Sequence, residues 1–229
     1  MYAIGKYSDS DKMSDLICNN YPMLLVMNRF GITLGFGDQS IREVCENKGV
    51  DVSTFLSVIN LLSRDDGIIY NGRIKDISLT SLIDYLKKSH NYFLDFKLPL
   101  IREKLKKAGA TDNNDICIAI MKYYDQYVQE VYNHMHYEEE VVFPYIKSLL
   151  EEGTNPRFNI EKFSKKHDNI DNKLTELKDI IIKYYPGDGS NNMIEVLFDI
   201  FSCAEDLSSH SIVENNLLIP AVRQIENNK

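Results

Sequence analysis

The sequence predicts an all-α protein in which a small helical N-terminal unit precedes an up-down-up-down four-helix bundle. Three observations indicate this fold class. Apolar residues recur at helical spacing in long segments, as at Leu79, Leu82 and Leu86. Strand-like alternation persists nowhere, and the few Pro and Gly residues stand mostly near the ends of the periodic segments.

The N-terminal unit is predicted to span residues 1–70 and to consist of short helices. Turn sequences interrupt the helical pattern at Phe30-Gly31 and at 35–38. Polar side chains that can cap a helix mark the starts of two further helices. These candidates are Ser40 for the first helix, and Asp51 or Ser53 for the second.

The bundle is predicted to span residues 77–229, after a linker that begins near residue 64. This linker contains Asp-Asp-Gly and Asn-Gly, which are both typical of turns. Four long helices follow, and their short connections make neighbouring helices antiparallel. The helices are predicted at about 78–107, 112–150, 156–185 and 191–225.

Composition argues against several classes of protein. A net charge of −8 argues against a general affinity for nucleic acid, which needs clustered Lys and Arg. No apolar run approaches the roughly 18 residues of a membrane span, and residues 1–11 lack the features of a secretory signal, so a cytoplasmic location is expected. The four cysteines have no CxxC spacing, so buried free thiols are expected rather than a zinc site or a disulfide framework.

An internal repeat carries the candidate chemistry. Residues 134–144 and 210–220 both read H-x3-E-x5-P. In a helix, positions i and i+4 lie on one face about 6 Å apart, so each copy offers an imidazole and a carboxylate to one point in the interior. The two pairs are His134 with Glu138 and His210 with Glu214.

Two further histidines extend the repeat, because His90 precedes His134 by 44 residues and His167 precedes His210 by 43. Four His and two Glu form a ligand set without thiolate, which suits a pair of metals such as iron or manganese better than a structural zinc. Bundle cores hold di-iron sites built from inward-facing Glu and His. The predicted metal ligands are His90, His134, Glu138, His167, His210 and Glu214.

Other polar residues near the motif are predicted to play lesser roles. His136 lies two positions from His134 and points off the ligand face, so a surface or outer role is expected. Glu139 and Glu140 are also off this face and are expected to be solvated. Glu130 lies four residues before a ligand histidine, where it either orients the imidazole through a hydrogen bond or lies at the rim in water.

The repeated motif resembles the hemerythrin-type HHE cation-binding domain, over roughly residues 78–226. The N-terminal unit also resembles the small helical domain that precedes this bundle in the di-iron family for repair of iron centres, known for restoring iron-sulfur clusters after oxidative or nitrosative damage. The resemblance implies a non-haem centre of two iron ions, with manganese as an alternative. The matching residues are Asp15-Leu-Ile, Pro22, Phe30-Gly31-Ile32, Gly37, Cys45, His134-x3-Glu138, His167-Asp168 and His210-x3-Glu214-Asn-Asn.

Two departures from the repair family limit what the resemblance implies. Where that family carries a Cys-Cys pair, this chain has Gly35-Phe36, so a function that depends on those thiols is not implied. The first ligand histidine in the family often lies one position later, which is Asn91 here, so His90 requires a small adjustment of helical register.

Three functional hypotheses follow. The first is a stress-response protein that delivers ferrous iron to damaged iron-sulfur proteins or reacts with nitric oxide. The second is a hemerythrin-like module that binds or senses oxygen or nitric oxide without repair activity, with the N-terminal unit as a partner or homodimer interface. The third is an interaction protein with a vestigial site, which the two complete H-x3-E pairs argue against. Neither a nucleic acid nor a membrane is an expected partner.

Overall fold

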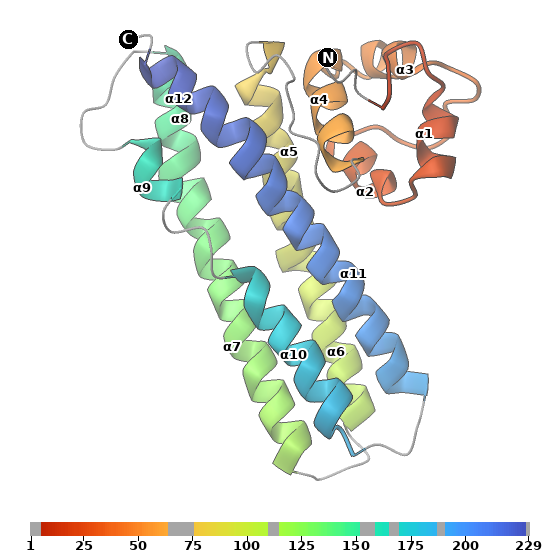
Figure 1. Cartoon of the computed structure of the whole chain (residues 1–229), viewed down its shortest axis with the longest axis vertical. Coiled ribbons are helices and arrows are strands. Elements are labelled where there is room, and N and C mark those ends of the chain that lie inside the picture. Colours follow the sequence, from red (N-terminus) through yellow and green to blue (C-terminus); the bar gives the residue numbers. More distant parts are fainter. Residues whose placement is uncertain are drawn as a thin grey trace. The chain divides into compact units, whose positions relative to one another are not determined.

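The computed structural model describes residues 6–63, 76–109, 115–151, 159–164, 170–186 and 191–227. Within these residues the elements are helices, apart from an isolated bridge between Lys12 and Ser40 (Figure 1). The predicted all-α fold class is therefore confirmed.

Two compact units make up the chain. The first comprises Met1–Ser89, Ile146–Ile160 and Ile212–Lys229, and the second comprises His90–Tyr145 and Glu161–Ser211. The boundary predicted between residues 70 and 77 falls in a stretch that lies mostly outside the described residues, so it stays a prediction.

Four short helices open the first unit, and local capping sets the start of the last two. In α3 (Ile41–Asn47), the Ser40 side chain accepts a hydrogen bond from the backbone N–H of Glu43, and the Glu43 carboxylate accepts one from the Ser40 N–H. In α4 (Val52–Leu62), Asp51 accepts one from the N–H of Thr54 at 2.7 Å. Both predicted helix starts are confirmed; the other two helices are α1 (Met13–Asn19) and α2 (Met23–Arg29).

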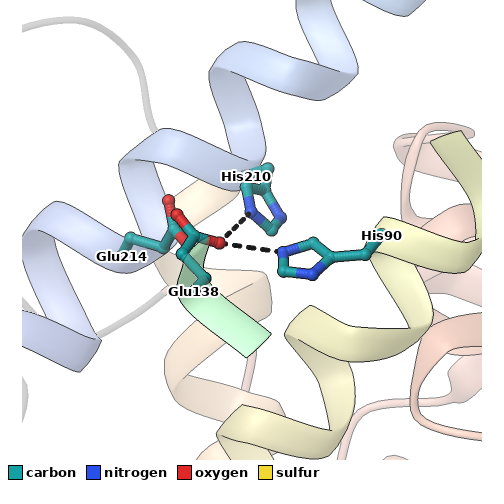
Figure 2. Close-up of side chains that lie close together, drawn as sticks. All are labelled: His90, Glu138, His210 and Glu214. Atoms are coloured by element: carbon teal, nitrogen blue, oxygen red, sulfur yellow. Dashed lines mark ion pairs between the residues drawn. The ribbon is translucent and has the colours of Figure 1, made fainter. Parts of the chain in front are cut away.

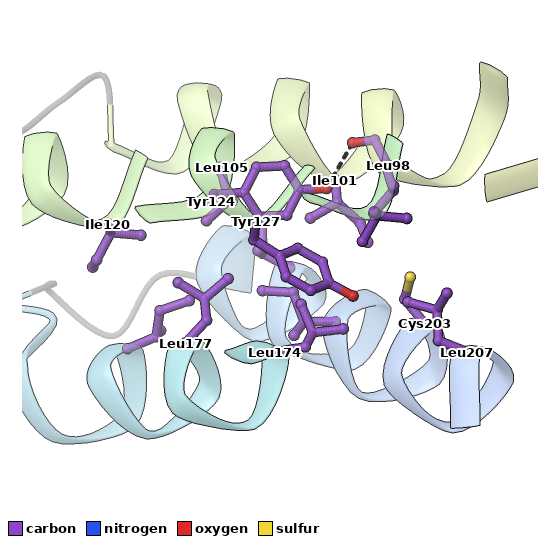
Figure 3. Close-up of a cluster of buried hydrophobic side chains, with 14 of the residues drawn as sticks. Leu98, Ile101, Leu105, Ile120, Tyr124, Tyr127, Leu174, Leu177, Cys203 and Leu207 are labelled. Carbon is purple, nitrogen blue, oxygen red and sulfur yellow. Dashed lines mark hydrogen bonds between the residues drawn. The ribbon is translucent and has the colours of Figure 1, made fainter. Parts of the chain in front are cut away.

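In the second unit, four helices pack around one apolar core. These are α6 (Leu98–Gly109), α7 (Asp115–Tyr137), α10 (Ile170–Tyr184) and α11 (Asn191–Val213). Leu, Ile and Tyr side chains from all four helices meet in this core (Figure 3). The hydroxyl of the buried Tyr124 donates a 2.8 Å hydrogen bond to the Leu98 carbonyl, which satisfies its polar group inside the core.

Of the four predicted bundle segments, three form continuous helical stretches. The first runs through α5 (Leu79–Asn91) into α6, the second through α7 into α8 (Phe143–Glu151), and the fourth through α11 into α12 (Ile219–Asn227). In the third segment the structure describes α9 (Ile160–Ser164) and α10. Residues 165–169 between them lie outside the described residues, so the prediction of one long helix there stays a prediction.

Each of the three continuous stretches contains a π-helical segment that periodicity did not predict. In each, the residue after the segment donates its backbone N–H to the carbonyl five positions earlier, and the next residue is a proline. Proline clashes with the carbonyl four residues before it, and the wider π turn relieves this clash. The segments are η2 (Tyr92–Lys97) before Pro99, η3 (Glu138–Val142) before Pro144, and η5 (Glu214–Leu218) before Pro220.

Candidate metal centre

A buried cluster of two histidines and two glutamates is assembled from the helical stretches that contain the π turns (Figure 2). His90 lies near the end of α5, and Glu138 is the first residue of η3. His210 lies in α11, four positions before Glu214, the first residue of η5. All four side chains are buried, so the cluster lies in an environment from which water is largely excluded.

The Glu138 carboxylate lies within ion-pair distance of three imidazoles. Its Oε1 lies 2.7 Å from Nε2 of His134, one helical turn earlier. Its Oε2 lies 3.0 Å from Nε2 of His90 and 4.0 Å from Nε2 of His210. The two oxygens of this single carboxylate therefore face different imidazoles.

Aromatic side chains hold the imidazole rings in place. The His90 ring stacks on Phe143 with centroids 5.6 Å apart, and its centroid lies 5.1 Å from that of His210. Phe93 packs edge-on against His210 at 6.1 Å. Because these rings fill the space around the imidazoles, the nitrogens are presented to the carboxylates in a restricted set of orientations.

Donor chemistry and charge in the cluster both fit a metal ion. His90, Glu138, His210 and Glu214 each offer a ligand atom, and these four atoms lie within 4.8 Å of one another. Imidazole nitrogen and carboxylate oxygen are the ligands that iron, manganese and zinc take in proteins. When Glu138 and Glu214 are ionised, they place two negative charges in the interior, where charge is costly unless it is compensated, and bound cations would compensate it.

Of the six predicted ligands, the structure brings five close together. His134 joins the buried cluster through Glu138, and its side chain is 17% exposed. His167 lies outside the described residues, so its position stays a prediction. Next to His134, the Phe163 ring stacks on the imidazole with centroids 6.3 Å apart.

The outer residues of the motif differ in how well the sequence predicted them. His136 is exposed and stacks on Tyr132, as expected of a residue off the ligand face. Glu130 pairs with Lys173 and is partly exposed, which agrees with the rim position. The Glu139 side chain is 37% exposed, so it is solvated in part as expected, but its Oε1 also lies 2.8 Å from Nδ1 of His90. No sequence signal marks this contact, because the two residues are 49 positions apart.

Comparison with known families identifies the domain. Residues 81–223 match the model of the hemerythrin HHE cation-binding domain. The chain belongs to the hemerythrin family. It is a hemerythrin-like metal-binding protein with a buried His/Glu cluster, as the repeated motif indicated.

Two curated relatives of this hemerythrin-family chain are iron-sulfur cluster repair proteins. One is ScdA of Staphylococcus haemolyticus, 24% identical over 202 residues that cover 84% of this chain and 89% of the relative. The other is YtfE of Yersinia pseudotuberculosis serotype O:1b, 30% identical over 95 residues, which are 41% of this chain and 42% of the relative. The similarity to ScdA thus extends over most of this chain, in agreement with the resemblance to the repair family.

None of the helices in the described part of the chain combines the length and the apolar character needed to cross a bilayer.

Proposed function

We propose that this chain holds a non-haem di-iron centre and acts in the repair of iron-sulfur clusters, or more generally in the response to nitrosative and oxidative stress. The similarity to a repair protein over 84% of the chain supports this role, because a match of this extent reaches beyond the bundle into the N-terminal unit. The proposed iron ligands are His90, His134, Glu138, His167, His210 and Glu214.

The geometry of Glu138 is the observation that carries the di-iron proposal. Its Oε1 faces His134 at 2.7 Å, while its Oε2 faces His90 at 3.0 Å. A carboxylate whose two oxygens face different imidazoles is suited to bridge two metal ions, as glutamates do in the di-iron carboxylate bundles. His90, His134 and His210 would hold the two iron ions together with Glu138.

The protein residues have separate tasks around such a centre. Two iron ions supply reversible electron transfer and open positions for small ligands such as oxygen or nitric oxide. Glu138 and Glu214 would compensate the charge of the cations, and the histidines would supply the nitrogen ligands. Phe93 and Phe143 pack against the His210 and His90 rings and keep water from these imidazoles.

Metal analysis of the anaerobically purified protein tests the di-iron proposal. We expect about two iron ions per chain, which is the content of a di-iron bundle site. Manganese and zinc are measured in the same sample, because the same ligand types accept them. A preparation with a single zinc ion, or with no metal after incubation with ferrous iron, would contradict the proposal.

An activity assay tests the repair role separately. An iron-sulfur protein damaged by nitric oxide is incubated with the iron-loaded chain, and the recovery of its cluster is followed by absorption. We expect recovery that needs the loaded chain. Equal recovery with the metal-free chain and free ferrous iron would contradict a repair role and leave the di-iron centre intact.

A second candidate function is the binding or sensing of oxygen or nitric oxide without repair, and the N-terminal segment favours it. Gly35 has a φ of 93°, a conformation that a cysteine adopts only with strain, so the backbone here suits glycine in place of the family's Cys pair. Burial, together with the charges of Asp51 and Glu46, raises the pKa of the Cys45 thiol to about 12, so this thiol stays protonated at neutral pH.

The two functions predict different behaviour toward small ligands. A binding or sensing module forms a reversible adduct, so its absorption spectrum returns to the starting state when oxygen or nitric oxide is removed. A repair protein loses iron to the damaged acceptor. Measuring the spectrum and the iron content of the same sample therefore separates them.

A further inference from the structure

The two nitrogens of the His90 ring face two consecutive glutamates. Nε2 lies 3.0 Å from Oε2 of Glu138, and Nδ1 lies 2.8 Å from Oε1 of Glu139. Glu138 is fully buried, whereas the Glu139 side chain is 37% exposed. The buried ring therefore lies between the interior of the cluster and a carboxylate at its edge.

The π turn explains how neighbouring residues reach the same ring. Consecutive side chains on an α-helix diverge by about 100°. Glu138 and Glu139 are the first two residues of η3, where the wider π turn reduces the angle between consecutive side chains. This turn is closed by the bond from the Phe143 N–H to the Glu138 carbonyl, and Phe143 also stacks on His90.

We propose that Glu139 is a positioning residue, which accepts the Nδ1–H of His90 and so holds Nε2 toward the cluster as the metal-binding nitrogen. An ionised carboxylate has no proton to donate and can only accept, so the proton of this contact belongs to Nδ1. With Nδ1 protonated, a neutral ring has its lone pair on Nε2, which faces Glu138. Partners of this kind fix the ring orientation and make the imidazole a stronger ligand.

A first measurement tests the hydrogen bond in the metal-free protein, and so does not depend on the proposed di-iron centre. Histidine-selective proton–nitrogen NMR detects the Nδ1–H of His90 when a hydrogen bond protects it from exchange. We expect this signal in the wild type and in Glu139→Gln, whose amide oxygen can still accept. We expect its loss in Glu139→Ala, and its persistence in Glu139→Ala would overturn the proposal.

A second measurement tests the consequence for metal binding, with zinc(II) as a diamagnetic probe in competition with a coloured chelator. Loss of an outer partner of a ligand histidine weakens metal binding by roughly 10- to 100-fold. We expect this loss in Glu139→Ala and substantial rescue in Glu139→Gln. The matched control is Glu140→Ala, which removes the neighbouring exposed carboxylate and should leave affinity unchanged.

The two measurements separate this inference from the proposed function, on which only its metal-binding part rests. A wild type that takes up no zinc(II) or iron(II) contradicts the metal centre, while the NMR comparison still decides the role of Glu139. Equal zinc affinity in the wild type and Glu139→Ala contradicts the positioning role, whatever metal the protein holds. Equal losses in Glu139→Ala and Glu140→Ala would mean that charge alone acts, and would also overturn it.

Discussion

The two copies of the H-x3-E-x5-P motif share the same helical pattern of the backbone, but their side chains have different surroundings. In both, the glutamate is the first residue of a π turn, and the proline lies two residues beyond its end. In the first copy, Glu138 lies within ion-pair distance of three imidazoles, including its own His134 at 2.7 Å. In the second copy, His210 lies 4.0 Å from Glu138, the glutamate of the other copy.

Exposure differs between the copies as well. The His134 side chain is 17% exposed, whereas that of His210 is 3% exposed and packs against His90 and Phe93. The sequence repeat thus specifies which residue types converge. The packing of the helices decides which glutamate contacts several imidazoles and which of the two motif histidines is more deeply buried. Four experiments test this difference between the two copies.

The largest expected difference is between the two glutamates. Glu138→Ala removes the carboxylate that faces three imidazoles, so we expect iron binding to weaken by more than about 100-fold, beyond the loss typical of an outer partner. Glu214→Ala should weaken it less, by roughly 10- to 100-fold. Chelator competition with anaerobic ferrous iron measures both. Equal losses in the two variants would remove the asymmetry between the copies.

The two histidines should differ in stability without metal. His210→Ala leaves a cavity among buried rings, so we expect the free energy of unfolding of the metal-free protein to fall by about 2–3 kcal/mol. His134→Ala truncates a partly exposed side chain and should cost about 1 kcal/mol. Urea denaturation of the metal-free variants measures the difference, and a greater loss in His134→Ala would reverse the assignment of the deeper ring.

The helices that carry the two copies are also tied to η2 and α6 in different ways. Asp199 of α11 pairs with Lys97 and Lys104 at 2.7 and 2.6 Å and is mostly buried, whereas Asp125 of α7 pairs with Arg102 in an exposed position. Burial acts to raise the pKa of Asp199, but the hydrogen bonds from Lys104 and Lys97 outweigh it and lower this pKa below its ordinary value of 3.8. The carboxylate is therefore ionised in the folded state at lower pH than in the unfolded chain.

We expect Asp199→Asn to cost roughly 1–2 kcal/mol at pH 7, and Asp125→Asn less than about 1 kcal/mol. Because the folded pKa is lowered, the stability from Asp199 is present above pH 3.8 and is lost as the pH falls through the lowered value. Urea midpoints of the wild type and Asp199→Asn should therefore begin to converge as the pH falls below the ordinary pKa of 3.8, and should coincide only below the lowered pKa of the folded state. A difference that stays constant down to the acid limit would show that Asp199 acts by packing.

The smallest effect is expected at the histidine inside the first copy that has no counterpart in the second. His136→Ala should change the free energy of unfolding by less than about 0.5 kcal/mol, because the side chain is exposed and contacts the exposed Tyr132. Iron content should equal that of the wild type. Iron loss comparable with that of His134→Ala would place His136 among the ligands.

Local chemistry explains why much of the fold and of the site could be predicted from the sequence. Ser40 and Asp51 begin helices through hydrogen bonds to residues three positions away, and such contacts need no tertiary structure. The i,i+4 spacing likewise places His134 beside Glu138 on one helical face, whatever the rest of the chain does. The three prolines that follow π turns were visible in the sequence, but a proline in a helix is also compatible with a kink or an end.

Residue patterns alone therefore predicted the all-α class, the starts of the two capped helices and the residue types of the candidate site. Two features depend on tertiary packing: Glu138 faces three imidazoles, and Glu139 reaches His90 from 49 positions away. The physical reason is that periodicity and capping act within one helix. The direction in which a side chain meets another helix depends on packing, and on the π turns that change the phase of each helix at the cluster.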